Sequence, residues 1–138
     1  MTDVSASKPF AWPVRVYYED TDAQGVVYYA NYFRFTERAR TEWLRSLGVD
    51  QERMLREERR MFVVVNASAE FLQPARFNDQ LVVTAAPADM SRASFDIEQR
   101  VHRNSSEGPL LFRSTVKAAY LDADTLKPQR IPRDLFQE

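Results

Sequence analysis

The spacing of hydrophobic residues changes twice along the chain. Apolar side chains fall on every second position over residues 14–20, which predicts a strand. Over residues 31–47 they recur every three or four positions, which is typical of an amphipathic helix. Asn31 is the predicted N-cap of that helix, and Gly48 is the residue expected to end it.

A charged stretch, residues 50–60, predicts a second and shorter helix. The period then returns to two, and four further strands are expected at 62–71, 80–86, 94–103 and 110–121. Pro132 is placed to begin a last short helix. A run of antiparallel strands and one long helix bury their apolar faces together most economically as a curved sheet wrapped around the helix, an α+β fold. Residues 1–9 are expected to form a flexible tail, and residues 10–138 a single domain.

Composition narrows the possible functions. The chain has 138 residues, of which 44% are hydrophobic and 28% charged, as in ordinary globular domains. Its 19 basic and 20 acidic residues give a net charge of -1, which disfavours nucleic-acid binding as the main function. With no cysteine and one histidine, thiol catalysis and the usual zinc sites are excluded, so we expect neither a metal nor a cofactor.

Membrane insertion is also disfavoured by the sequence. The longest apolar run, near residues 61–65, is far shorter than the ~18 residues that a membrane span requires. The first eight residues lack the apolar core of a signal peptide. These features, together with the absence of disulfides, predict a cytoplasmic protein.

The turn before the long helix is the segment richest in chemistry. It holds three carboxylates within four positions, at Glu19, Asp20 and Asp22. A carboxylate near a helix N-terminus is stabilised by the helix dipole, and free amides at that end can bind a developing oxyanion. Such a group can act on a carbonyl as nucleophile or general base. On spacing alone, however, a solvated capping turn is favoured over a catalytic site.

Residues 14–43 change that balance, because they resemble the opening of the YbgC subgroup of hotdog-fold acyl-CoA thioesterases. They are also similar to the related 4-hydroxybenzoyl-CoA thioesterases. The motif consists of Asp22, Gly-Val-Val-Tyr-Tyr at 25–29 and Asn-Tyr at 31–32. The likeness extends through 62–64, 74–76, Asp79 and 127–128. It implies a hotdog fold, with one long central helix wrapped by a curved antiparallel sheet.

By this resemblance, Asp22 is the catalytic carboxylate, and a backbone N–H near Tyr29 polarises the thioester carbonyl. The remaining substrate-binding candidates, expected near the start of the helix, are Tyr18, Tyr32 and Val63. The CoA moiety is expected at Arg92 and Ser94. Many YbgC members carry histidine at this position, whereas this chain carries Tyr29, like the hydroxybenzoyl branch. Short aliphatic and small aromatic acyl groups therefore both remain open as substrates.

The predicted function is therefore hydrolysis of short aliphatic or small aromatic acyl-CoA thioesters. The alternative from another class is a non-catalytic acyl-binding or scaffold protein of the cell-envelope Tol-Pal system. A hotdog dehydratase would need a histidine beside an acid, and His102 lies far along the chain. A phosphatase Asp-x-Asp motif at residues 20–22 would need an apolar strand leading into its first acid, where Glu19 stands.

Partners follow from the same features. The resemblance implies an acyl-CoA substrate, and acyl carrier protein remains open as an alternative carrier. A sheet wrapped on one helix leaves a strand edge exposed, and exposed edges favour pairing. We therefore expect a homo-oligomer that is at least a dimer. The favoured assembly is a tetramer built as a dimer of dimers.

Overall fold

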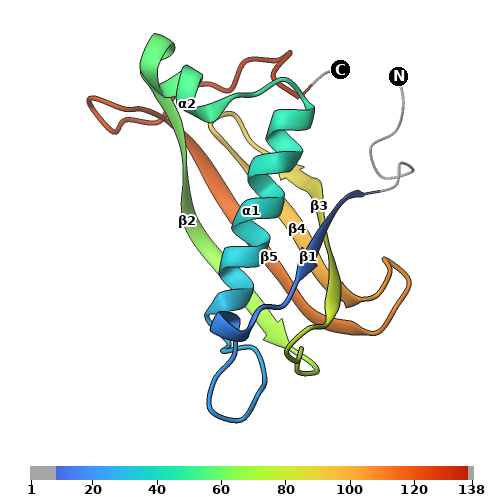
Figure 1. Cartoon of the computed structure of the whole chain (residues 1–138). Helices are drawn as coiled ribbons and strands as arrows, with labels where there is room; N and C mark the ends of the chain where they lie inside the picture. The colour runs from blue at the N-terminus through green and yellow to red at the C-terminus, as the bar shows by residue number, and fades with distance from the viewer. Residues whose placement is uncertain (1–8, 137–138) are drawn as a thin grey trace.

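The long amphipathic helix of the sequence is α1, Asn31–Ser46, and it lies across one face of a single sheet (Figure 1). The computed structural model describes residues 9–136. The buried side chains of α1 follow the predicted period and are Tyr32, Phe35, Thr36, Ala39, Trp43 and Leu44. Burying a large apolar side chain of this kind contributes about 1.5–3 kcal/mol, so this face fixes the helix on the sheet.

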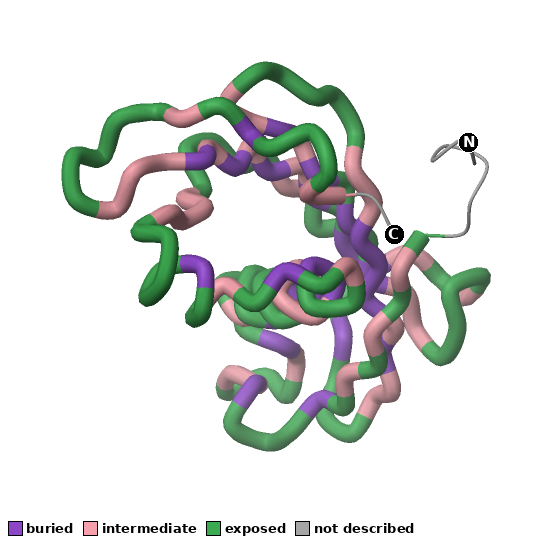
Figure 2. The backbone as a smooth tube through the Cα atoms, turned by 90° about the horizontal axis from the view of Figure 1, so that it is seen from above, coloured by how far each residue is buried: buried purple, intermediate pink, exposed green. Residues whose placement is uncertain are grey.

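The five strands are β1 (Phe10–Arg15), β2 (Arg60–Phe71), β3 (Gln80–Met90), β4 (Ser94–Arg103) and β5 (Leu110–Asp122). They pair antiparallel in the order β1-β3-β4-β5-β2 and curve around α1, which confirms the predicted α+β hotdog architecture. The buried residues are concentrated where α1 meets the sheet (Figure 2). The core lies there because each central strand directs every second side chain toward the helix.

The two edges of the sheet differ in character. β1 carries Pro13, which has no N–H to offer another strand. β2 is twice as long, contains no proline, and exposes Val64 and Val65, which are 44% and 56% accessible. α1 packs mainly over β1 and β3, so the helix-facing side of β2 remains open toward its end at Phe71. β2 is therefore the edge more suited to pairing.

The strand predicted at 14–20 is wrong in its position. β1 ends at Arg15, and Tyr18–Asp20 form a single 3₁₀ turn, η2. The Asp20 carboxylate causes the break, because its Oδ2 accepts the Tyr17 N–H at 2.8 Å while the Asp20 N–H donates to the Tyr17 carbonyl at 3.0 Å. Local bonding by an aspartate thus overrides the alternating pattern.

The predicted N-cap is also wrong. Ala30 is the N-cap of α1, and Asn31 is the first helical residue. The Asn31 side chain does not bond to the amides of its own helix, because it donates to the Asp20 carbonyl at 2.9 Å. The predicted helix end is confirmed: Gly48 adopts φ +87°, and its N–H donates to the Arg45 carbonyl.

The charged second helix is present, although not as one regular element. α2, Gln51–Arg53, leads directly into a π-helical turn, η3, Met54–Glu58. Beyond β5, the helix predicted to begin at Pro132 is absent from the described residues, which form only a turn at 133–136. The predicted tail at residues 1–9 lies outside the described residues except for Pro9.

Candidate active site

Asp22 lies on a tight exposed loop that returns to the start of α1. Its N–H donates to the Val26 carbonyl at 2.9 Å, and its carbonyl accepts the N–H of Gly25. Gly25 has φ +80°, a conformation that favours glycine. One carboxylate oxygen, Oδ1, accepts the Gln24 N–H at 2.9 Å, and the other has no partner among residues 9–136. The loop thus fixes the acid and leaves one oxygen available.

Asp20, two positions earlier, has a different role. It is only 9% exposed, and its carboxylate closes the η2 turn. Its carbonyl accepts both the Tyr28 N–H at 3.1 Å and the Asn31 Nδ2 at 2.9 Å. Asp20 is therefore a structural acid that ties the Asp22 loop to the first residues of α1.

Two amides at the start of α1 have no acceptor in the described part of the chain. They belong to Tyr29 and Ala30, whereas the N–H of Tyr28 bonds to Asp20 and that of Asn31 bonds to the Tyr28 carbonyl. The first amides of a helix lack partners within it and carry the positive end of its dipole. An acid and a pair of free donors are thus held on connected segments, as oxyanion chemistry requires.

Aromatic rings surround this end of the molecule. Tyr29 is 59% exposed, with ring centroids 4.7 Å from Tyr28 and 6.0 Å from Phe71 at the end of β2. Tyr18 is 79% exposed and makes an edge contact with Phe77 at 5.8 Å. The sequence did not single out Phe71, because it reads there as an ordinary strand residue. Tyr18 and Tyr29 thus place exposed rings on the two segments that flank the Asp22 loop in sequence.

The other two predicted substrate residues are less accessible or more distant. Tyr32 lies in the core, where its ring stacks on Phe112 at 4.8 Å and its hydroxyl accepts the Ala75 N–H at 2.9 Å. Burial raises the pKa of Tyr32 above its ordinary value. Val63 lies near the opposite end of β2 from Phe71, and it points to the face away from α1, since its neighbour Phe62 packs on the core. Tyr32 is therefore a core residue, and Val63 lies toward the other end of β2 from Phe71.

The predicted CoA residues lie at the far end of the sheet. Arg92 lines a pocket of about 460 Å³ together with two further arginines, Arg130 and Arg133. None of the three guanidinium groups has an ion-pair partner within residues 9–136. Ser94 begins β4 next to this pocket without lining it. The sequence analysis missed Arg130 and Arg133, although the Arg-Ile-Pro-Arg run at 130–133 marks them.

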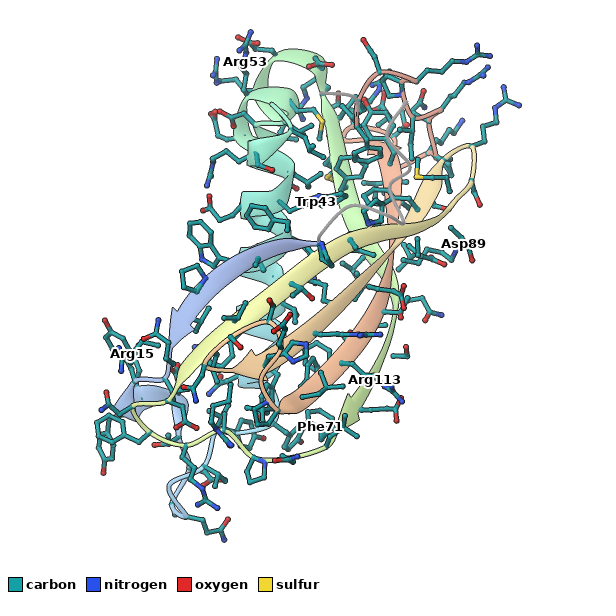
Figure 3. The ribbon with its side chains drawn as sticks, turned by 90° about the vertical axis from the view of Figure 1, so that its right-hand side faces the viewer. Arg15, Trp43, Arg53, Phe71, Asp89 and Arg113 are labelled. Atoms are coloured by element: carbon teal, nitrogen blue, oxygen red, sulfur yellow. The ribbon has the colours of Figure 1, made fainter. Side chains whose placement is uncertain are left out.

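The pocket and Asp22 are separated by the length of β3. The segment that leads into β3 bonds to the Asp22 loop, because the Val27 N–H donates to the Ala75 carbonyl at 2.8 Å. β3 then begins at Gln80 and ends at Met90 in the wall of the pocket. Eleven strand residues span about 35 Å. Figure 3 shows Phe71, at the end of β2, and Asp89, near the end of β3, toward different ends of the sheet.

Two other kinds of site were sought in residues 9–136. No cluster of three or more His, Asp or Glu side chains is arranged to hold a metal ion there. No helix in that part of the chain has the length and apolar character needed to cross a bilayer.

Comparisons with known proteins identify relatives of this chain. The family model of the thioesterase-like superfamily matches residues 16–138. The acyl-CoA thioesterase YbgC of Haemophilus influenzae is 42% identical over 126 residues, which cover 91% of this chain and 90% of that one. The acyl-CoA thioester hydrolase YbgC of Escherichia coli is 41% identical over 94% of both chains. The 4-hydroxybenzoyl-CoA thioesterase of Pseudomonas sp. strain CBS-3 superposes with TM-score 0.84 at 22% identity, over 94% of this chain and 97% of that one, and shows the shared fold.

The family model and the YbgC relatives define the class of this protein as a thioester hydrolase. The chain belongs to the thioesterase-like superfamily, and within it resembles the YbgC proteins.

Proposed function

We propose that the protein hydrolyses acyl-CoA thioesters, with Asp22 as nucleophile or general base. The observation that carries this proposal is the bonding between the Asp22 loop and the start of α1, where the Tyr29 and Ala30 amides have no acceptor among residues 9–136. The names of the YbgC relatives support the same activity. They give no support to a non-catalytic scaffold of the Tol-Pal system.

Both roles of Asp22 begin from the same arrangement. As a nucleophile, the carboxylate attacks the thioester carbon, the C–S bond breaks, and CoA leaves as a thiolate that takes a proton from water. A second water then hydrolyses the mixed anhydride, which releases the acid and restores the Asp22 carboxylate. As a base, it takes a proton from the water that attacks that carbon. In either route the Tyr29 N–H stabilises negative charge on the carbonyl oxygen.

We further propose that the acyl group is short and aliphatic or small and aromatic. Tyr18 and Tyr29 flank the Asp22 loop in sequence, and Phe71 contacts Tyr29; in this proposal these bulky rings limit the room for a long chain. An added methylene alters discrimination in an apolar pocket by about 1–3 kcal/mol, so the preference should be graded.

Release of free thiol from a panel of acyl-CoAs tests this function. We expect the highest kcat/KM for short aliphatic, benzoyl or 4-hydroxybenzoyl groups, and at least tenfold lower values for palmitoyl-CoA. Tyr29→His should shift the preference from aromatic toward short aliphatic groups. A profile that rises steadily to palmitoyl would refute the small pocket, and no hydrolysis of any thioester would favour the scaffold.

The carrier we propose is CoA, bound by its phosphates in the pocket of Arg92, Arg130 and Arg133. Three guanidinium groups that have no ion-pair partner within residues 9–136 surround one pocket and suit phosphate oxygens, to which arginine makes strong charge-assisted bonds. Ser94, at the start of the adjoining strand, is proposed to contact the same ligand.

Neutralising this pocket should raise KM and leave kcat nearly unchanged. Each charge-assisted hydrogen bond is worth about 1.5–3 kcal/mol, so replacing the three arginines with glutamine should raise KM for acyl-CoA at least tenfold. The matched substrate is the same acyl group on pantetheine, which lacks the nucleotide and should show the same KM in both proteins. Equal KM values for acyl-CoA in the wild-type protein and the triple variant would show that these arginines do not bind the substrate.

We propose that two copies complete each site. Within one chain the pocket lies about 35 Å from the Asp22 end. Antiparallel pairing of two β2 edges would set the beginning of one β2 beside the end of the other. Phe62, at the beginning, stacks on Phe136 of the pocket, and Phe71, at the end, contacts Tyr29. The pocket of one copy would then serve the Asp22 of its partner, and a dimer of dimers remains the proposed assembly.

The cytoplasmic location also remains a proposal, which cell fractionation tests.

A further inference from the structure

One carbonyl group connects the candidate acid to the candidate oxyanion donors. The Asp20 carbonyl accepts the Tyr28 N–H at 3.1 Å and the Asn31 Nδ2 at 2.9 Å. These two donors flank Tyr29 and Ala30, whose amides are free in the described part of the chain. Two residues after Asp20, the chain reaches Asp22. The bonded carbonyl therefore sets the free amides relative to the carboxylate.

The Asn31 bond is the only part of this connection made by a side chain. The bond spans eleven residues of sequence and is partly buried. An asparagine at the start of a helix ordinarily bonds to its own helical amides, as an N-cap does. Here its amide group points to the preceding loop, so its contribution is to the position of that loop.

We infer that Asn31 is a positioning residue for thioester hydrolysis, which rests on the proposed function. Its Nδ2 occupies the second acceptor site of the Asp20 carbonyl and holds that oxygen beside Tyr28. Without Asn31, the loop is free to move and the carbonyl is free to accept one of the neighbouring amides. Either change separates Asp22 from the donors or occupies the donors themselves. A misplacement of about 1 Å can cost ~10²-fold in rate.

The test compares Asn31→Ala and Asn31→Asp with the wild-type protein. The first removes the donor, and the second keeps the shape while replacing the donor with an acceptor that the helix dipole stabilises at this position. We expect kcat on the preferred acyl-CoA to fall by ten- to a hundredfold in both variants, with KM within about threefold and Tm nearly unchanged. A purely structural role would lower kcat only in proportion to the loss of folded protein.

Thr21→Val is the matched control. The Thr21 hydroxyl donates to the Tyr18 carbonyl at 2.7 Å, so it makes a side-chain bond within the same loop that does not reach α1. This variant should keep wild-type kcat. An equal loss of kcat in Thr21→Val, or kcat within twofold of wild type in both Asn31 variants, would overturn the inference.

Hydrogen exchange separates this inference from the proposed function, because it needs no turnover. Asn31→Ala should speed exchange of the Tyr28 N–H, which donates to the Asp20 carbonyl at 3.1 Å, and leave the centre of α1 protected. Unchanged exchange there would also overturn the inference. If the wild-type protein hydrolyses no acyl-CoA while exchange responds as expected, the proposed function fails. The hydrogen bond from Asn31 to the Asp20 carbonyl would still be shown to hold the loop in place.

Discussion

Asp22→Asn is expected to abolish thioester hydrolysis while the fold remains intact. The substitution keeps the size of the side chain and an oxygen that can accept the Gln24 N–H, so the loop should retain its conformation. It removes the negative charge that a nucleophile or general base requires. We expect kcat to fall at least ~10²-fold. The measurement is thiol release under saturating acyl-CoA, with Tm recorded for each protein.

Glu19→Gln is the matched control for that experiment. Glu19 is an exposed acid three positions earlier, and the substitution removes the same charge by the same chemical change. Its activity should stay near the wild-type value. Near-normal turnover in Asp22→Asn at unchanged Tm would show that the carboxylate has been assigned wrongly.

The regular elements could be predicted because their period is set by burial on one side. α1 and β4 match the expected ranges closely, since apolar side chains recur at the helical or strand spacing throughout each. The predicted strand at 14–20 failed where Asp20 bonds to the backbone at Tyr17. A side chain that bonds to its own neighbourhood is not visible in a hydrophobic pattern.

The candidate site also contains residues that the sequence could identify and residues that it could not. Asp22 and Tyr29 are near each other in sequence, so a motif places them on connected segments. Phe71, Arg130 and Arg133 come from distant parts of the chain, and only the folded sheet shows which end they share. The different roles of Asp20 and Asp22 depend on their burial, which a run of acidic residues does not reveal.

Blocking the edge of β2 is expected to dissociate the oligomer and remove its activity. Ser114 Oγ donates to the Ser68 carbonyl at 2.7 Å, so the backbone groups of Ser68 face β5 and those of Ala67 face the open edge. Ala67→Pro therefore deletes an N–H from the pairing edge without breaking the ladder to β5. With Asp22 and the arginine pocket separated, kcat/KM should fall at least ~10²-fold, about 2.7 kcal/mol in transition-state binding.

The opposite edge offers a matched control, because the same substitution is available there. Pro13 has no N–H to give to β3, so its nitrogen is expected to face the open edge. Ala11 lies two residues earlier in the same strand, so its N–H faces the same way. Ala11→Pro should leave both the molar mass and kcat/KM at wild-type values. Light scattering at micromolar concentration, combined with thiol release, measures both quantities. An Ala67→Pro protein that keeps its mass and its activity would show that β2 is not the interface. A wild-type monomer with full activity would show that each chain carries a complete site.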